Sequence, residues 1–97
     1  MRTINESNFK ETIQDNVVVQ FSAVWCGPCK ALTRTIETNE KNFDLPFYKI
    51  DIDEATSVAK EYGVRSVPTL ILFKAGQEVS RVIGNQPLEK LNALIKS

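Results

Sequence analysis

The sequence has no histidine, only two cysteines and no excess of charge of either sign. Lysine and arginine together number 12, as do aspartate and glutamate, so no overall field attracts nucleic acid or an anionic membrane. No apolar run is long enough to span a bilayer, and Met1–Asn8 lacks the apolar core of a signal peptide. We therefore expect a cytoplasmic protein that binds neither nucleic acid nor a membrane.

The same scarcities limit what Cys26 and Cys29 can do. With no histidine and no third cysteine, a mononuclear zinc site would need carboxylates or a partner chain to complete it. A structural disulfide gains its stabilisation by closing a long loop, and so short a loop gains little. Redox chemistry is therefore the natural use of the pair, with a zinc half-site completed by dimerisation as an alternative.

In length and composition, the chain is otherwise typical of a small globular protein. Its 97 residues suffice for one small domain, and 42% of them are hydrophobic while 25% are charged. No internal repeat, low-complexity tract or linker divides it. We expect residues 1–97 to form a single domain.

Hydrophobic patterning predicts alternating helices and strands in the order α-β-α-β-α-β-β-α. Strands rich in apolar residues are expected at 17–23, 47–52, 69–73 and 79–83, and the last two are joined by a hairpin turn at 74–77. Right-handed crossovers would place helices on both faces of this sheet. The sequence therefore predicts an α/β fold with a four-stranded mixed sheet.

Helix boundaries are expected from capping residues. Asn5 or Ser7 would cap a first helix, and Gly63 suits the left-handed position after a third. Asn85 and Pro87 would begin the last helix. The second helix is expected to begin at the cysteines and to end near residue 39.

Cys26 and Cys29 therefore lie where a predicted strand ends and a predicted helix begins. At a helix N-terminus, unpaired N–H groups and the macrodipole favour negative charge, which lowers the pKa of a thiol there. A second cysteine one turn later can attack the mixed disulfide that the first one forms. Gly27 leaves the sulfur unobstructed, and Pro28 costs little in a first helical turn.

At this point the sequence resembles a known family. Trp25–Lys30, with the sequence Trp-Cys-Gly-Pro-Cys-Lys, resembles the active-site signature of thioredoxins. Arg65–Thr69 resembles the family's cis-proline loop, Lys74–Gly76 its hairpin turn, and Ile83–Gly84 its third loop beside the active site. Lys49 matches a lysine that the family keeps near the buried cysteine. The resemblance extends over nearly the whole chain and implies the thioredoxin fold and a protein-disulfide reductase.

The resemblance also implies roles for individual residues. Cys26 would be the exposed nucleophile and Cys29 the buried resolving thiol, with no cofactor and no metal. A shallow apolar groove for the substrate backbone would be formed by Trp25, Val67, Pro68, Ile83 and Gly84. From the residues alone, a proline before a strand fits a tight turn, and a cis bond is a minority outcome. Partners would be proteins with disulfides and a thioredoxin-reductase-type electron donor, with the chain working as a monomer.

Gln20 departs from the family pattern. Thioredoxins usually carry a buried aspartate at this position, with a role in proton transfer to and from the buried thiol. Because its neighbours are apolar, Gln20 is expected to be buried and hydrogen-bonded, but it cannot act as a base at neutral pH. Water or Lys49 would have to serve Cys29 instead. We therefore count Gln20 and Lys49, with Gly27 and Pro28, among the residues that tune the redox pair.

Two other interpretations of the motif are considered, of which the first stays open. Some thioredoxins act as non-catalytic subunits of larger complexes through the same exposed loops, so this chain could be a binding module. A glutaredoxin-like variant is disfavoured, because Gly27-Pro28 is not the usual intervening pair of that family. The proline favours a reductant over an oxidant by resemblance.

Overall fold

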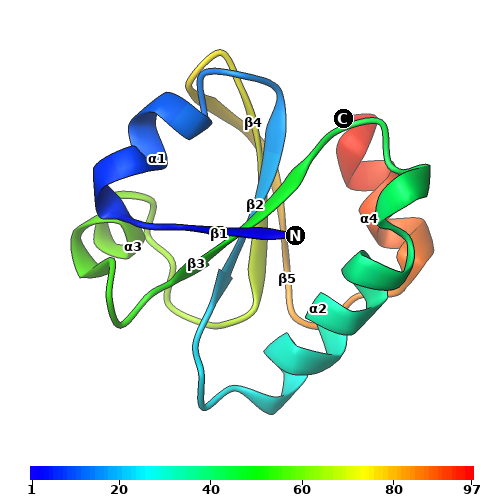
Figure 1. The fold of residues 1–97 in the computed structure, drawn as a ribbon, viewed down its shortest axis with the longest axis horizontal. Coiled ribbons are helices and arrows are strands. Elements are labelled where there is room, and N and C mark those ends of the chain that lie inside the picture. The colour runs from blue at the N-terminus through cyan, green and yellow to red at the C-terminus, as the bar shows by residue number, and fades with distance from the viewer.

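The computed structural model describes all residues, 1–97, as a central sheet between two layers of helices (Figure 1). One face of the sheet carries α1 (Glu6–Thr12) and α3 (Thr56–Glu61), and the other carries α2 (Gly27–Thr38) and α4 (Leu88–Ile95). A 3-10 turn, η1 (Glu40–Asn42), follows α2. None of these helices combines the length and the apolar character needed to cross a membrane. The predicted α/β fold with helices on both faces is confirmed.

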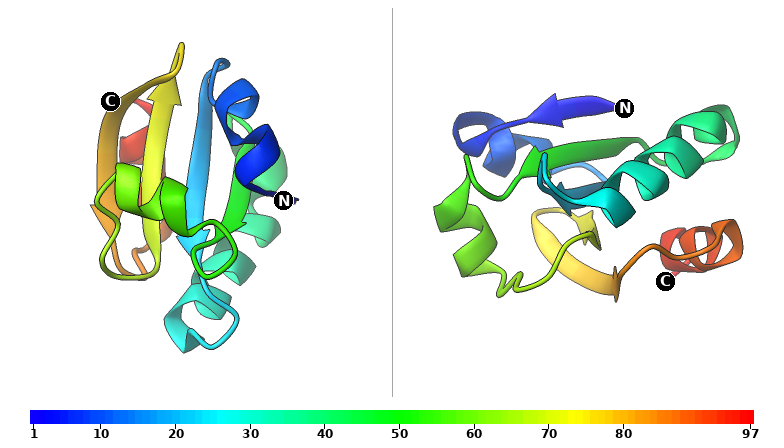
Figure 2. Two further views of the ribbon diagram at one scale, coloured as in Figure 1. Left: turned by 90° about the vertical axis from the view of Figure 1, so that its left-hand side faces the viewer. Right: turned by 90° about the horizontal axis from the view of Figure 1, so that it is seen from below.

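The sheet has five strands in the order β1-β3-β2-β4-β5 (Figure 2). The strands are β1 (Arg2–Ile4), β2 (Val17–Ser22), β3 (Phe47–Asp51), β4 (Thr69–Lys74) and β5 (Gln77–Ile83). β1, β3 and β2 run parallel, whereas β4 is antiparallel to both β2 and β5. The mixed character of the sheet is as expected, but the predicted number of four strands is corrected to five.

The additional strand, β1, lies at the edge of the sheet and pairs with β3, with Arg2 opposite Tyr48 and Ile4 opposite Ile50. It contains only three residues, of which only Ile4 is buried. So short a segment has no hydrophobic period that could be recognised in the sequence. Its pairing is defined by β3, which lies far along the chain.

β2 is the central strand, and all six of its residues are buried. Side chains alternate between the faces of a sheet, so β2 contributes to two separate hydrophobic cores. Val19 and Phe21 pack with Phe9 of α1, while Val18 packs with Leu32 of α2. By the same alternation Gln20 lies on the α2 side, directly behind the cysteines.

Most of the expected helix and turn boundaries are confirmed. The Asn5 side chain accepts hydrogen bonds from the N–H groups of Ser7 and Asn8, and it forms a capping box with Asn8. Gly63 adopts a φ of 63° just after α3. Ala75 and Gly76 have φ values of 52° and 82°, so both central residues of the hairpin turn are left-handed, as a tight turn between twisted strands requires.

The start of α4 differs from the expectation. Asn85 does not cap the helix; the N-cap position is Pro87, and no side chain caps it. The buried Leu91 and Leu94 instead fix the helix against the sheet. Packing therefore substitutes for the missing cap.

Arg81 of β5 connects this strand to the end of α3. Its guanidinium donates to the carbonyl of Tyr62 at 2.6 Å and to both carboxylate oxygens of Glu78 at 2.6 and 2.7 Å. The bidentate hydrogen bonds to Glu78 raise the pKa of Arg81 above its usual value. The link steadies the chain where it leaves α3 and enters the loop that contains Val67 and Pro68.

Candidate active site

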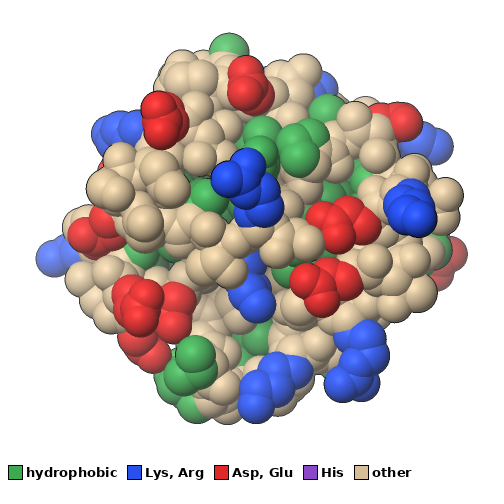
Figure 3. Space-filling model, viewed as in Figure 1, with side chains coloured by type: hydrophobic (Ala, Val, Ile, Leu, Met, Phe, Trp, Pro, Cys, Tyr) green, Lys and Arg blue, Asp and Glu red, His purple; other side chains and the backbone are tan.

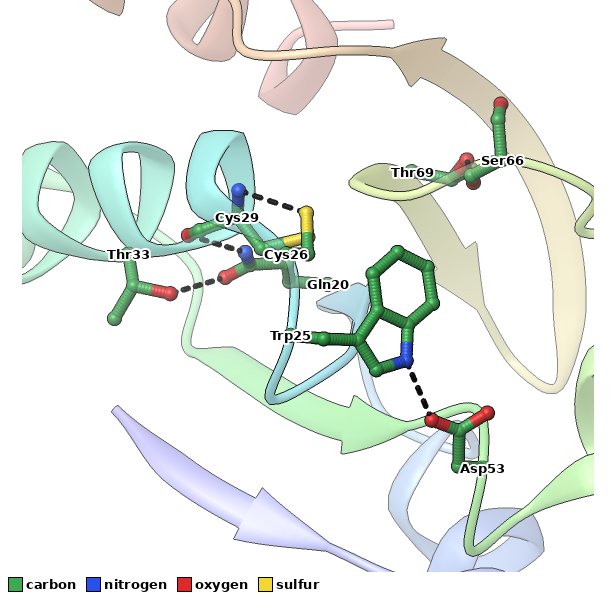
Figure 4. Close-up of a disulfide and its surroundings, with 8 residues drawn as sticks. All are labelled: Gln20, Trp25, Cys26, Cys29, Thr33, Asp53, Ser66 and Thr69. Atoms are coloured by element: carbon green, nitrogen blue, oxygen red, sulfur yellow. Dashed lines mark hydrogen bonds between the residues drawn. A yellow bond between two sulfur atoms is a disulfide. The ribbon is translucent and has the colours of Figure 1, made fainter.

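Cys26 and Cys29 form a disulfide at the N-terminus of α2, with their Cα atoms 5.2 Å apart (Figure 4). Cys26 is the N-cap residue, and its sulfur accepts a hydrogen bond of 3.1 Å from the backbone N–H of Cys29. The predicted placement between strand and helix is therefore confirmed. At the N-terminus of α2 the N–H of Cys29 is thus directed at the Cys26 sulfur, and a helix N-terminus favours negative charge at that place.

The expectation that Cys26 is exposed is corrected by the structure. Cys26 keeps 4% of its surface exposed and Cys29 keeps 1%. The two residues cluster with Ala23, and the half-buried Ile52 and Val67 pack against them. Cys26 is the more accessible cysteine, but these neighbours and the bond to Cys29 cover most of it.

Trp25 stands on the surface beside the disulfide, with 67% of its surface exposed. Its indole N–H donates a 2.8 Å hydrogen bond to a carboxylate oxygen of Asp53, which lies between β3 and α3 (Figure 4). Asp53 is in turn placed by its own N–H, which donates to the side chain of Asp51 at 2.8 Å. Sequence reasoning did not identify Asp53, because no local pattern joins residues 28 positions apart.

The family resemblance assigns Trp25 to the substrate groove, so loss of the Asp53 carboxylate, which holds Trp25 in one orientation, is expected to weaken substrate binding. For Asp53→Ala we expect KM for a protein disulfide to rise about two- to fivefold, the size of one exposed hydrogen bond. Steady-state kinetics measures this. In a Trp25→Phe background, which lacks the indole donor, Asp53→Ala should have no further effect; a full effect there would contradict this role of Asp53.

The apolar surface around the disulfide is completed by two loops. The Val67–Pro68 peptide bond is cis, as the resemblance implies, and Pro68 is buried while Val67 is half-buried. The carbonyl of Pro68 accepts a 2.8 Å hydrogen bond from the N–H of Gly84. This bond joins the two loops next to Ile83, which lies opposite Thr69 in the β4–β5 pairing and is 54% exposed.

Gln20 is fully buried behind the cysteines, as expected, and both ends of its amide are hydrogen-bonded. Nε2 donates to the backbone carbonyl of Cys29 at 3.2 Å, and Oε1 accepts from the hydroxyl of Thr33 at 3.1 Å (Figure 4). Thr33 was not identified from the sequence. Helical spacing from Cys29 was the available signal, but it does not show which face of α2 meets Gln20.

Lys49 lies opposite Gln20 in the β2–β3 pairing and is half-buried. It shares a surface groove of about 950 Å³ with Thr33 and with Lys30 and Arg34 of α2. Acidic residues line the same groove, and the surrounding face carries both signs without a large area of either (Figure 3). The groove gives water access to the side of α2 that carries Thr33.

No three or more histidine, cysteine or acidic side chains gather in a geometry that could hold a metal ion. The zinc half-site considered from the sequence would direct both sulfurs at a metal ion. Here they are bonded to one another.

Comparison with known proteins agrees with this site. The family model described as Thioredoxin matches residues 1–97. Thioredoxin Asp f 29 of Aspergillus fumigatus is 45% identical over 95 residues, which cover 92% of this chain and 86% of that protein. The thioredoxin of Staphylococcus haemolyticus is 44% identical over 91 residues, covering 91% of this chain and 88% of that protein.

Solved structures give the same result. A mutant thioredoxin from Halobacterium salinarum superposes with a TM-score of 0.89 at 39% identity, covering 98% of this chain and 87% of that one. The Malassezia sympodialis thioredoxin Mala s 13 gives a TM-score of 0.86 at 37% identity, covering 99% and 88%. Likeness of this degree along nearly the whole length shows that the chain belongs to the thioredoxin family.

Proposed function

We propose that, within the dithiol–disulfide exchange common to thioredoxins, Cys26 is the attacking thiol of this chain and Cys29 the resolving thiol. The observation that carries this assignment is the hydrogen bond from the Cys29 N–H to the Cys26 sulfur at the N-terminus of α2. A donor and a helix terminus aimed at one sulfur favour its thiolate over that of the other. Insulin reduction by the chain and by its Cys26→Ser variant tests the assignment.

The exchange runs in two steps. The Cys26 thiolate attacks one sulfur of the substrate disulfide, forms a mixed disulfide and releases the other substrate sulfur as a thiolate. The Cys29 thiolate then attacks the Cys26 sulfur, forms the Cys26–Cys29 disulfide and releases the second substrate thiolate. Two electrons pass to the substrate, and both of its thiolates take up protons from solvent. The disulfide described above is thus the oxidised product of the reaction.

Thioredoxins need no cofactor for this exchange, because the cysteine pair itself carries the electrons. They act on disulfide substrates and are recharged by a thioredoxin reductase. We infer that this chain works as one domain and as a monomer, in the cytoplasm, where a reducing environment keeps a reductant of this type charged. Sedimentation of the purified protein would measure the oligomeric state.

We assign substrate binding to the apolar surface beside the disulfide. Trp25 and Ile83 are exposed large hydrophobic side chains next to the two loops, and exposed apolar side chains that gather into one patch are typical of an interaction surface. The Pro68–Gly84 hydrogen bond supports this assignment, because it holds both loops at one edge of the cysteine pair. The remaining contact residues would be Val67, Pro68 and Gly84.

Gly27 and Pro28 separate the two cysteines and are assigned to tuning of the redox pair. Both are exposed, and a Cβ added at Gly27 would meet nothing within 4 Å. The open space at Gly27 supports access for a substrate beside the cysteine pair. Pro28 stands in the first turn of α2, where its missing N–H leaves no hydrogen bond unmade.

Gln20 and Lys49 are assigned to the environment of the resolving thiol. Because the Gln20 amide does not ionise near neutral pH, it cannot take the proton that Cys29 must lose. The groove brings water as far as Thr33 and Lys49, which makes water the proton acceptor of our assignment, and a positive charge on Lys49 would favour the thiolate. The pH dependence of resolution would then follow the thiols alone.

Introducing a carboxyl at position 20 should therefore add a pH dependence. For Gln20→Asp, a carboxyl buried in this position has a raised pKa and, once ionised, can accept the Cys29 proton. We expect the rate of mixed-disulfide resolution to gain an inflection at that pKa. Stopped-flow rates across pH 5 to 9 (about the range that thiol exchange allows) measure it.

Gln20→Glu is the second variant, because it keeps the length of the side chain. When protonated it can still donate to the Cys29 carbonyl and accept from Thr33. Thermal unfolding of both variants separates a folding defect from a kinetic effect. Profiles that coincide with that of the unchanged chain for both variants would refute the assignment of Gln20.

A further inference from the structure

We propose that Thr33 is a positioning residue for the resolving step: by holding the Gln20 amide, it fixes the backbone of Cys29 against β2. The proposal rests on the assignment of Cys29 as the resolving thiol. Thr33 lies on α2, four residues after Cys29 and half-buried, and its hydroxyl donates to Oε1 of Gln20 at 3.1 Å. The Gln20 Nε2 group then donates to the Cys29 carbonyl at 3.2 Å.

The chemistry of the amide allows only this arrangement. The Cys29 carbonyl can only accept, so the NH₂ end of Gln20 must face it. The opposite end, Oε1, then needs a donor, and Gln20 is fully buried, so bulk water cannot supply one. The Thr33 hydroxyl is the donor that Oε1 has. Without it, a buried acceptor would be left unsatisfied and the amide would lose its anchor.

This bridge is the one side-chain hydrogen-bonded link between the sheet and α2. Gln20 itself is held firmly, because β2 pairs on both sides: Gln20 lies opposite Lys49 of β3 and Leu70 of β4. Its amide reaches both Cys29 and Thr33, which stand on consecutive turns of the helix. The first two turns of α2 are therefore held in a fixed position against β2, the most buried strand of the protein.

The Thr33 hydroxyl has an alternative hydrogen-bond acceptor that it does not use. A threonine within a helix commonly donates back to the carbonyl four residues earlier, as Thr35 does to Ala31 at 3.3 Å. For Thr33 that carbonyl belongs to Cys29, which already accepts from Gln20. The two half-buried threonines on this helix thus differ in the acceptor of the hydroxyl, and Thr35 provides a matched control.

The hydrogen bond of Thr33 affects how readily the Cys29 sulfur reaches the Cys26 sulfur. Attack within one chain is fast because the reacting sulfurs are held close together, and a loose first turn lowers that advantage. When the Thr33 hydrogen bond is lost, the reduced form gains freedom that closing the disulfide must remove again. Disulfide formation between Cys26 and Cys29 should therefore become slower and less favourable.

Thr33→Val tests this, since it keeps the side-chain shape and removes the hydroxyl. We expect the equilibrium constant for forming the Cys26–Cys29 disulfide, measured against glutathione, to fall about three- to tenfold, the worth of one hydrogen bond. The decay of a preformed mixed disulfide at Cys26 should slow by a similar factor. Thr33→Ser should restore both values, and Thr35→Val should leave both unchanged.

The link to Gln20 is tested in a Gln20→Met background, where the amide is absent. There Thr33→Val should change neither quantity, because the partner of the hydroxyl is gone. Equal values for Thr33→Val and the unchanged chain, or equal effects of Thr33→Val and Thr35→Val, would overturn the proposal. Failure of the cysteine assignment would show differently, as activity that survives in Cys26→Ser.

Discussion

Cys26→Ser is expected to abolish disulfide reduction by this protein. In an insulin assay with dithiothreitol, the variant should raise turbidity no faster than dithiothreitol alone. The serine hydroxyl is not ionised near neutral pH, and the remaining thiol, Cys29, keeps only 1% of its surface exposed, so no accessible thiolate is left to attack a disulfide. The fold should persist, because the bond it removes closes a loop of very few residues.

The matched control is Thr35→Val, which changes a half-buried position on the same helix without touching either sulfur. Its activity should equal that of the unchanged chain. Circular dichroism of Cys26→Ser guards against loss of the fold as the cause of inactivity. Turbidity from a folded Cys26→Ser protein at the rate of the unchanged chain would refute the role of Cys26 and would favour a non-catalytic binding module.

Cys29→Ser is expected to react with a substrate disulfide but to remain bound to it. Its Cys26 still attacks a disulfide, but no second thiol stands behind it to release the product. The protein should therefore accumulate as a covalent mixed disulfide, one substrate per chain, and multiple-turnover reduction should stop. Non-reducing electrophoresis and intact-protein mass spectrometry would detect the adduct, and addition of dithiothreitol should cleave it.

The double variant Cys26→Ser/Cys29→Ser is the control for this trap, because it lacks both thiols and should capture nothing. If Cys29→Ser formed no adduct while Cys26→Ser did, the two roles would be reversed. The trapped partners would also identify physiological substrates, since the adduct keeps them bound through purification.

The parts of the site that could be predicted from the sequence are those with local causes. Cys26 and Cys29 were placed correctly because a buried strand that begins with three valines ends at Ser22, shortly before them, and a helix begins at Gly27. Burial of Gln20 followed from its apolar neighbours along β2. The assignment of Lys49 to the same region came from family resemblance, and the pairing of β2 with β3 agrees with it.

What could not be predicted depends on contacts across the fold. β1 exists because β3 offers it an edge, and its three residues have no pattern of their own. Asp53 reaches Trp25, and Thr33 reaches Gln20, only after separate segments have come together. The low exposure of Cys26 likewise arises from Ile52 and Val67, which belong to other parts of the chain.

The buried amide of Gln20 also affects how the stability of the fold varies with pH. A carboxyl enclosed there would have a folded-state pKa above its unfolded value, because burial penalises its charged form. Its presence would therefore lower the unfolding free energy as pH rises from the unfolded pKa through the folded one. Gln20 binds no proton in either state, so this position contributes no such slope. A polar side chain at the centre of β2 is thus accommodated without tying the unfolding free energy to its own protonation, independently of how fast Cys29 loses its proton.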